Sequence, residues 1–255
     1  MNRNWLLGFV VVLVITAGCH KRTEPITTTT TTKPVVTGMS IKFTDVAGSE
    51  PLVFATKWYK DANGDSLQFS SFNYFISNIK FTDNNGKVYA EPESYHLVIG
   101  TADSTKNFFI NVPEGNYTSM TFMIGVDSAR NVSGAQTGAL DINSGMFWDW
   151  NTGYIMARVE GTSPQAKSLN GMVAYHIGGF KSQYSGIRPV TLSLPNAMVT
   201  TGKTTTISLK ADILEWFKTP HLIDVNTIQV ITMVGAPSQT IAENYADMFS
   251  VDHID

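Results

Sequence analysis

The sequence has little cysteine and little charge. Cys19 is the only cysteine among 255 residues, so a disulfide framework and a thiolate metal site are both excluded. Charged residues make up 15%, below the roughly 25% that is usual in soluble domains. The formal net charge is −3, from 18 Lys and Arg against 21 Asp and Glu. Because nucleic-acid binding needs a clustered basic face, this balance argues against a nucleic-acid partner.

The sequence also lacks the motifs of the common enzyme classes. It has no Gly-rich phosphate loop, no zinc-binding helix, no nucleophile elbow and no clustered carboxylate pair. Asp61, Asn63 and Asp65 alternate as in a calcium loop. However, the twelfth position of that string is Phe72 instead of glutamate, so a turn is the better interpretation. We therefore expect a protein that is not an enzyme.

Long hydrophobic runs are absent beyond the first residues. Arg3 precedes an apolar run over residues 5–15, which suits a signal peptide and is too short to span a bilayer. The run ends in Thr16-Ala17-Gly18-Cys19, which resembles a bacterial lipobox. This predicts a signal peptide over residues 1–18 and a lipid on Cys19 as the membrane anchor. The alternative is a core cysteine after an ordinary signal peptide.

The segment that follows is predicted to be a tether. Residues 20–38 contain six consecutive threonines, Thr27–Thr32, followed by Lys33-Pro34, and have almost nothing apolar to bury. Such a chain favours an extended, solvated state. No acidic run follows Cys19, so we expect a location in the bacterial cell envelope, on the outer membrane and facing the periplasm.

Residues 39–255 are predicted to form one all-β domain. Short apolar runs alternate with period two and are separated by turn residues, as in Ser40–Thr44, and Asn85-Gly86 suits a hairpin. Short helices are expected at residues 212–217 and 242–249. The pattern indicates a two-sheet antiparallel β-sandwich with one or two short helices. Strands are predicted at residues 40–44, from 67, 73–81, 95–99, 107–112, 117–125, 153–160, 171–177, 189–194, 204–210 and 227–234.

One stretch, residues 125–161, is unusual for such a domain. Residues 127–145 form a long polar loop, and loops of that length usually carry function. The loop leads into Trp148 and Trp150, which share a side if the segment is extended. Downstream, His176 ends another predicted strand. The simpler interpretation is that both tryptophans are core aromatics and that His176 is a buried, hydrogen-bonded histidine.

Six motifs along the chain form a distinctive combination. They are Tyr74–Ile79, Gly125–Ser128, Gly138–Asp141, Gly145–Tyr154, Glu160-Gly161 and His176–Gly178. Together they resemble the MbnP-like family, over roughly residues 40–250. This resemblance implies a secreted β-sandwich that binds copper and is partnered with a dihaem cytochrome-peroxidase-like protein. In some members a tryptophan is oxidised to kynurenine and then binds copper together with histidine.

The resemblance implies that His176 and either Trp148 or Trp150 lie at the copper site. Copper(I) is soft and accepts imidazole and thioether, so His176 and Met146 are suitable ligand types. His96 and His221 compete as a second histidine ligand. Asp127, Arg130 and Asp141 are expected to organise the long loop through hydrogen bonds.

Two other function classes stay open. One is a carbohydrate- or surface-binding sandwich that uses Trp148, Trp150 and Tyr154 as stacking platforms without a metal. The other is a purely structural envelope lipoprotein. The copper-binding lipoprotein, serving storage or delivery, is the favoured prediction.

Overall fold

The computed structural model describes residues 36–149 and 151–255. The predicted signal peptide, Cys19, residues 20–35 of the predicted tether and Trp150 therefore lie outside the described residues. Within the described part, no helix has the length and apolar character needed to cross a membrane.

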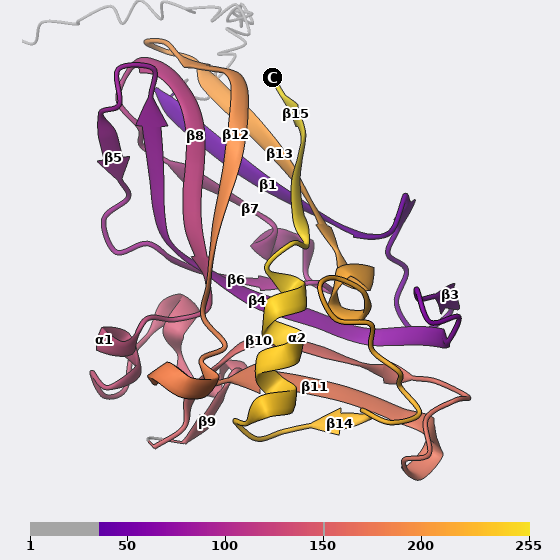
Figure 1. Cartoon of the computed structure of the whole chain (residues 1–255). Coiled ribbons are helices and arrows are strands. Elements are labelled where there is room, and N and C mark those ends of the chain that lie inside the picture. Colours follow the sequence, from indigo (N-terminus) through magenta and orange to yellow (C-terminus); the bar gives the residue numbers. More distant parts are fainter. Residues whose placement is uncertain (1–35, 150) are drawn as a thin grey trace, which may run out of the picture. The chain divides into compact units, whose positions relative to one another are not determined.

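Residues 36–255 form two β-sheets that pack face to face (Figure 1). The small sheet has the order β15-β13-β1-β2, with β7 also paired to β1. Its strands are β1 (Gly38–Ala47), β2 (Glu50–Pro51), β7 (Asn107–Ile110), β13 (Thr204–Asp212) and β15 (Phe249–Ile254).

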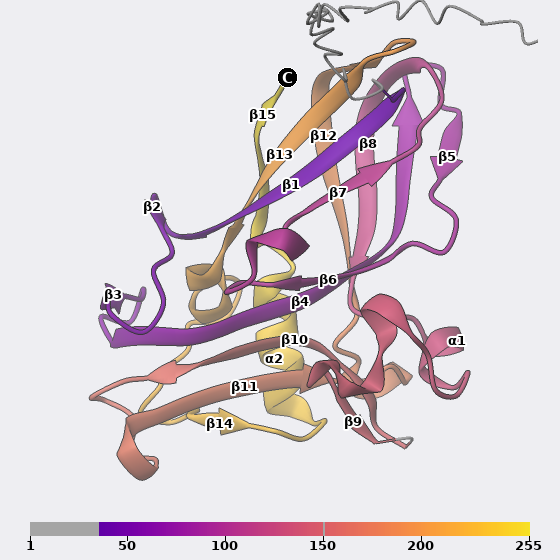
Figure 2. The ribbon, with the colours of Figure 1, turned by 180° about the vertical axis from the view of Figure 1, so that it is seen from behind.

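The large sheet has the order β12-β8-β4-β10-β11-β14, with β3, β5 and β6 also paired to β4 and β9 to β10. Figure 2 shows its strands from behind. They are β3 (Tyr59–Lys60), β4 (Ser66–Asp83), β5 (Val88–Ala90), β6 (Tyr95–Ile99), β8 (Gly115–Ile124), β9 (Phe147–Asp149), β10 (Gly153–Thr162), β11 (Met172–Gly178), β12 (Arg188–Val199) and β14 (Val230–Ile231).

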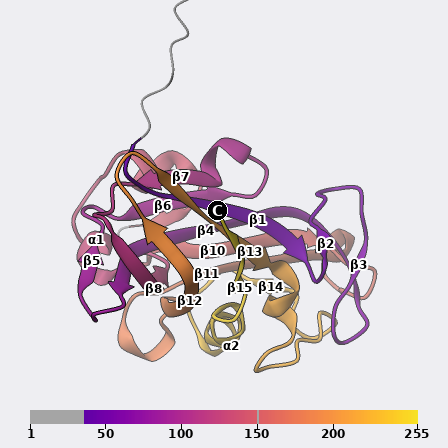
Figure 3. The same cartoon turned by 90° about the horizontal axis from the view of Figure 1, so that it is seen from above.

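Helices are few and short among the described residues. The α-helices are α1 (Ser128–Asn131) and α2 (Ala236–Tyr245), and Figure 3 shows α2 end-on from above. The 3-10 helices are Asp103–Thr105, Gly138–Leu140, Ile142–Ser144, Leu169–Gly171, Ser182–Tyr184 and Ile213–Phe217.

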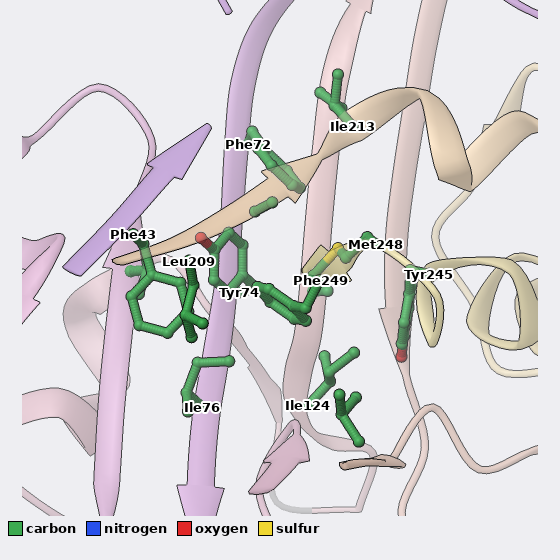
Figure 4. Close-up of a cluster of buried hydrophobic side chains, with 14 of the residues drawn as sticks. Phe43, Phe72, Tyr74, Ile76, Ile124, Leu209, Ile213, Tyr245, Met248 and Phe249 are labelled. Carbon is green, nitrogen blue, oxygen red and sulfur yellow. The ribbon is translucent and has the colours of Figure 1, made fainter. Parts of the chain in front are cut away.

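The sandwich core lies between the two sheets and is rich in aromatic rings (Figure 4). Phe249 of β15 lies 5.7 Å from Phe43 of β1 and 5.4 Å from Tyr74 of β4, between ring centroids. Trp216 and Tyr245 extend the core, with ring centroids 5.0 Å apart. These contacts join the C-terminal strand and α2 to both sheets.

A second, smaller cluster covers the outer face of the large sheet. We call it the outer cluster; its buried members are Phe75, Val126, Leu140, Met146, Tyr154, Ile155 and Met156. Phe75 belongs to β4, whose neighbours Tyr74 and Ile76 point into the sandwich core. Residues Ser71–Ser77 are therefore buried without alternation, because both faces of β4 are covered.

The predicted sandwich is confirmed, and most of its strand pairs are antiparallel. Two pairs, β1 with β13 and β11 with β14, are parallel. The hairpin at residues 83–86 joins β4 to β5, and Asp61–Asp65 is the turn between β3 and β4.

The C-terminal prediction was wrong in detail. The expected helix at residues 242–249 begins earlier, with Pro237 in its first turn, and ends at Tyr245. Phe249 instead starts β15, where it pairs with Ala211 and packs among the core aromatics. The expected strand over residues 227–234 is limited to β14, and the segment 212–217 is a 3-10 helix.

Candidate functional site

His176 lies on the outer face of the large sheet. It is opposite Arg158 of β10, which in turn is opposite Asn73 of β4. Its neighbours Tyr175 and Ile177 are fully buried in the sandwich core. Since successive side chains of a strand alternate between faces, His176 and Gly178 both point outward.

Trp148 of β9 covers Gly178. A Cβ atom at Gly178 would lie only 2.3 Å from Cζ3 of the Trp148 ring, so the indole contacts bare backbone that only glycine provides. Residues two apart on one face of a strand are separated by about 7 Å. Trp148 therefore covers the position two residues after His176, on the same face of β11.

Glu160 orients the imidazole of His176. The Nε2 atom of His176 lies 2.8 Å from Oε1 of Glu160, which leaves Nδ1 as the ring nitrogen for another partner. A carboxylate that holds one histidine nitrogen while the other binds is common in metal sites. The His176 side chain is 20% exposed, so a small ion can reach it.

Arg158 fastens the segment that carries Trp148. Its guanidinium Nη1 donates to the carbonyl oxygen of Gly145 at 3.1 Å. Gly145 has a φ of 75°, a left-handed value that favours glycine, and the chain then turns into β9. Nε of Arg158 is buried and makes no hydrogen bond.

Met146 is enclosed in the outer cluster. Its side chain is fully buried, and its carbonyl oxygen accepts a hydrogen bond from the Ile155 N–H at 2.9 Å. Trp148 and Phe147 pack against the same cluster. Met146 is therefore buried in the same apolar cluster against which Trp148 packs.

His96 lies on the opposite face of the large sheet. It pairs with Ile76 of the sandwich core, and its ring stacks on Phe108 at 3.6 Å. Its Nε2 atom is 2.9 Å from Oε2 of Glu91. The sheet separates His96 from His176, so the prediction that both bind one ion is wrong. The sequence pattern does not reveal which face of the sheet each residue occupies.

His221 does not supply the missing second histidine either. Its Nε2 atom is 2.6 Å from Glu243 of α2, and its backbone N–H donates to Asn244. The buried side chains Ile241, Ala242 and Tyr245 of α2 belong to the sandwich core. His221 is thus held on the core side, away from the outer face.

The residues present fit a copper ion only in part. Across residues 36–149 and 151–255, no three His, Cys, Asp or Glu side chains lie close enough together to hold a metal. His176 offers one imidazole nitrogen beside Trp148, and an intact indole is a poor ligand because its N–H is a donor only. A chemical change of the Trp148 ring would have to supply further metal-binding atoms at this position.

The long loop is organised by hydrogen bonds, as expected for Asp127. That carboxylate accepts from Arg130 N at 3.2 Å, from Asn78 Nδ2 at 3.0 Å and from the Tyr95 hydroxyl at 2.5 Å. Sequence reasoning missed Asn131, which donates to the Val126 carbonyl at 2.6 Å and accepts from Tyr154 N at 2.9 Å. These bonds connect the loop to the strand that leads away from β9.

Tyr154 cannot serve as a stacking platform for a ligand. It is 1% exposed, and its hydroxyl donates to the Leu140 carbonyl at 2.6 Å. Its ring packs against Phe75 and Phe147. The sugar-binding alternative that used Tyr154 is corrected on this point, because the residue is part of the outer cluster.

The family model MbnP matches residues 36–234. The chain belongs to the MbnP family. Among solved structures, MbnP from Methylosinus trichosporium is similar, with a TM-score of 0.50, 15% sequence identity, and coverage of 78% of this chain and 82% of that chain. No curated protein sequence matches.

The match to the MbnP family confirms the resemblance seen in the sequence, and the structural likeness shows the shared fold. Membership of the family supports a copper-related role in general terms.

Replacing Asp127 by Asn should destabilise the domain in a pH-dependent way. Burial raises the pKa of Asp127, but hydrogen bonds from Asn78, Tyr95 and two backbone N–H groups outweigh it and hold that pKa below the ordinary value of 3.8. Such a group stabilises the folded state above its unfolded pKa, and the contribution is lost as the pH falls through the lower folded pKa. We expect Asp127→Asn to reduce the free energy of unfolding by about 1–2 kcal/mol at neutral pH.

Urea denaturation at neutral pH and at about pH 3 checks this expectation. The difference between wild type and Asp127→Asn should shrink at the lower pH. Asp247→Asn, at an exposed position, is the matched control and should change stability by less than about 0.5 kcal/mol. A difference that stays constant over this pH range would contradict the ionised network.

Proposed function

We propose that this member of the MbnP family is a copper-binding protein of the bacterial cell envelope, serving storage or delivery, and not an enzyme. The observation that supports this best is the placement of Trp148 on Gly178, beside His176 on the outer face of the large sheet. His176 would bind copper(I) through Nδ1, since Nε2 is held by Glu160.

Trp148 is the residue we propose to be oxidised to kynurenine. The incomplete donor set of the described residues supports this step, because kynurenine carries an aromatic amine and a ketone where the indole had no free acceptor. The half-buried position of Trp148 also leaves the ring coupled to the surface, where an external oxidant can act.

The oxidant for this reaction is hydrogen peroxide, used by a dihaem partner protein. Two hydrogen peroxide molecules supply the two oxygen atoms that cleave the C2–C3 bond of the indole, and two waters leave. The product, N-formylkynurenine, then takes up one water and releases formate to leave kynurenine. The net change in the side chain is one carbon lost and one oxygen gained.

His176→Ala should weaken copper(I) binding by the mature protein at least about 100-fold, because it removes the only imidazole on this face of the described sheet. Glu160→Gln should weaken it about tenfold, as expected for a group that orients a ligand. A competition titration with a chromophoric copper(I) chelator measures both. His221→Ala is the matched control and should keep wild-type affinity; equal losses in His221→Ala and His176→Ala would argue against this site.

Coexpression with a dihaem cytochrome-peroxidase-like partner should convert Trp148 to kynurenine. Peptide mapping by mass spectrometry would then show one carbon lost and one oxygen gained at Trp148, and copper affinity should rise. Trp148→Phe should abolish both changes. Modification confined to Trp150, or both tryptophans intact in copper-loaded protein, would defeat the assignment.

We also propose that the protein is anchored to the outer membrane, facing the periplasm, through lipid on Cys19. The lipobox-like segment and the absence of a later apolar run support this anchor. Changing Cys19 to Ala should release the protein from the membrane fraction, as measured by fractionation and immunoblotting. Equal membrane retention of the variant would show that the anchor is something else.

A further inference from the structure

A pocket lies at the far end of β10 from Trp148. Gly153, at the start of β10, pairs with Asp149 of β9, whereas Thr162, at its end, lines the pocket together with Trp58, Ser163, Asn170 and Gly171. Strands rise about 3.3 Å per residue, so the two places are about 30 Å apart. The pocket has a volume of about 350 Å³ and is separate from the candidate copper site.

Trp58 forms one wall and is 48% exposed. The backbone that carries it is fixed, because the neighbouring Tyr59 is buried. The Tyr59 hydroxyl donates to the Pro51 carbonyl at 3.0 Å and accepts from the Val53 N–H at 2.7 Å. The indole is thus presented to solvent on an anchored segment.

The remaining lining residues belong to the end of β10 and the turn between β10 and β11, which is also fixed. Ser163 N donates to the Gly171 carbonyl at 2.8 Å, and Ser66 N of β4 donates to Gln165 Oε1 at 3.1 Å. A Cβ atom on Gly171 would lie 2.6 Å from the Ser163 carbonyl oxygen. This part of the lining is therefore a close-packed turn that needs little ordering when a ligand enters.

The chemistry of the lining selects the ligand. None of the described residues that line the pocket carries a charge, which disfavours an ionic ligand. An indole has a flat apolar face, and the lining residues Thr162 and Asn170 carry a hydroxyl and an amide that can donate and accept hydrogen bonds. A ligand that matches must be neutral, have one apolar ring face and carry polar groups around its edge.

We propose that this pocket binds a neutral pyranose ring of a saccharide, stacked on Trp58. The axial C–H face of a pyranose matches the indole, and its hydroxyl groups match the Asn170 amide and the Thr162 hydroxyl. The volume suits one ring, with further rings extending into solvent. This activity does not depend on copper binding.

The test is saccharide binding by the mature protein. Maltose, cellobiose and N,N′-diacetylchitobiose are titrated into the protein, followed by tryptophan fluorescence and by saturation-transfer NMR. We expect saturable binding of at least one of these sugars, weakened about tenfold or more in Trp58→Ala. Asn170→Gly should weaken binding about threefold or more; glycine keeps the left-handed backbone at this position, where φ is 55°.

Two controls make the result decisive. Leu169→Ala changes an apolar side chain that is 82% exposed on the same turn and should bind as wild type does. His176→Ala should also bind sugar normally, so failure of the copper proposal and failure of this one are distinguishable. Thermal unfolding confirms that each variant is folded. Absence of saturable binding to all three sugars, or equal binding by Trp58→Ala, overturns the proposal.

Discussion

Strand β4 is covered on both faces along residues 71–77, and the rest of the domain is arranged to satisfy this burial. On the inner face, Tyr74 and Ile76 belong to the sandwich core between the sheets; on the outer face, Phe75 belongs to the outer cluster. A sheet with a single apolar face would need only the small sheet to cover it. The second apolar face requires its own cover, which is provided by the loop after β8 and the first residues of β10.

This need for cover places the candidate site. Leu140 of the long loop and Met146, which directly follows it, pack with Phe75 and Tyr154. Hydrogen bonds of Asp127 and Asn131 fix where the loop leaves β8 and where it returns to β10. After the loop, the chain forms the short strand β9, whose residues Phe147 and Trp148 pack against the outer cluster. As a result, the Trp148 indole lies on Gly178 of β11 and packs against the outer cluster.

The sequence was sufficient for the architecture because period-two alternation and turn chemistry are local signals. The strand over Asn73–Phe81 and the Asn-Gly hairpin could be read directly. The parallel pairing of β1 with β13 could not be predicted, because the two strands are about 165 residues apart and no local sequence signal indicates their pairing. For the same reason Phe249 was assigned to a helix: its apolar spacing suits a helix, and only the aromatic partners Phe43 and Tyr74 select the strand.

The candidate site was predicted in part for a similar reason. Residue type and family motifs indicated His176 and either Trp148 or Trp150. They left His96 and His221 open as a second histidine ligand, since the face on which each residue lies depends on tertiary packing. The hydrogen-bond partners of the imidazole rings do not distinguish the candidate histidine either. His96, His176 and His221 each have a ring nitrogen on a glutamate, and His253 pairs with aspartates.

The missing side chain at Gly178 distinguishes His176 from the other described histidines. An alanine there would place a methyl group inside the Trp148 ring and push the indole off the sheet. The glycine two residues after the histidine therefore has a role that its own chemistry does not suggest. It sets how closely the Trp148 ring can approach the strand that carries His176.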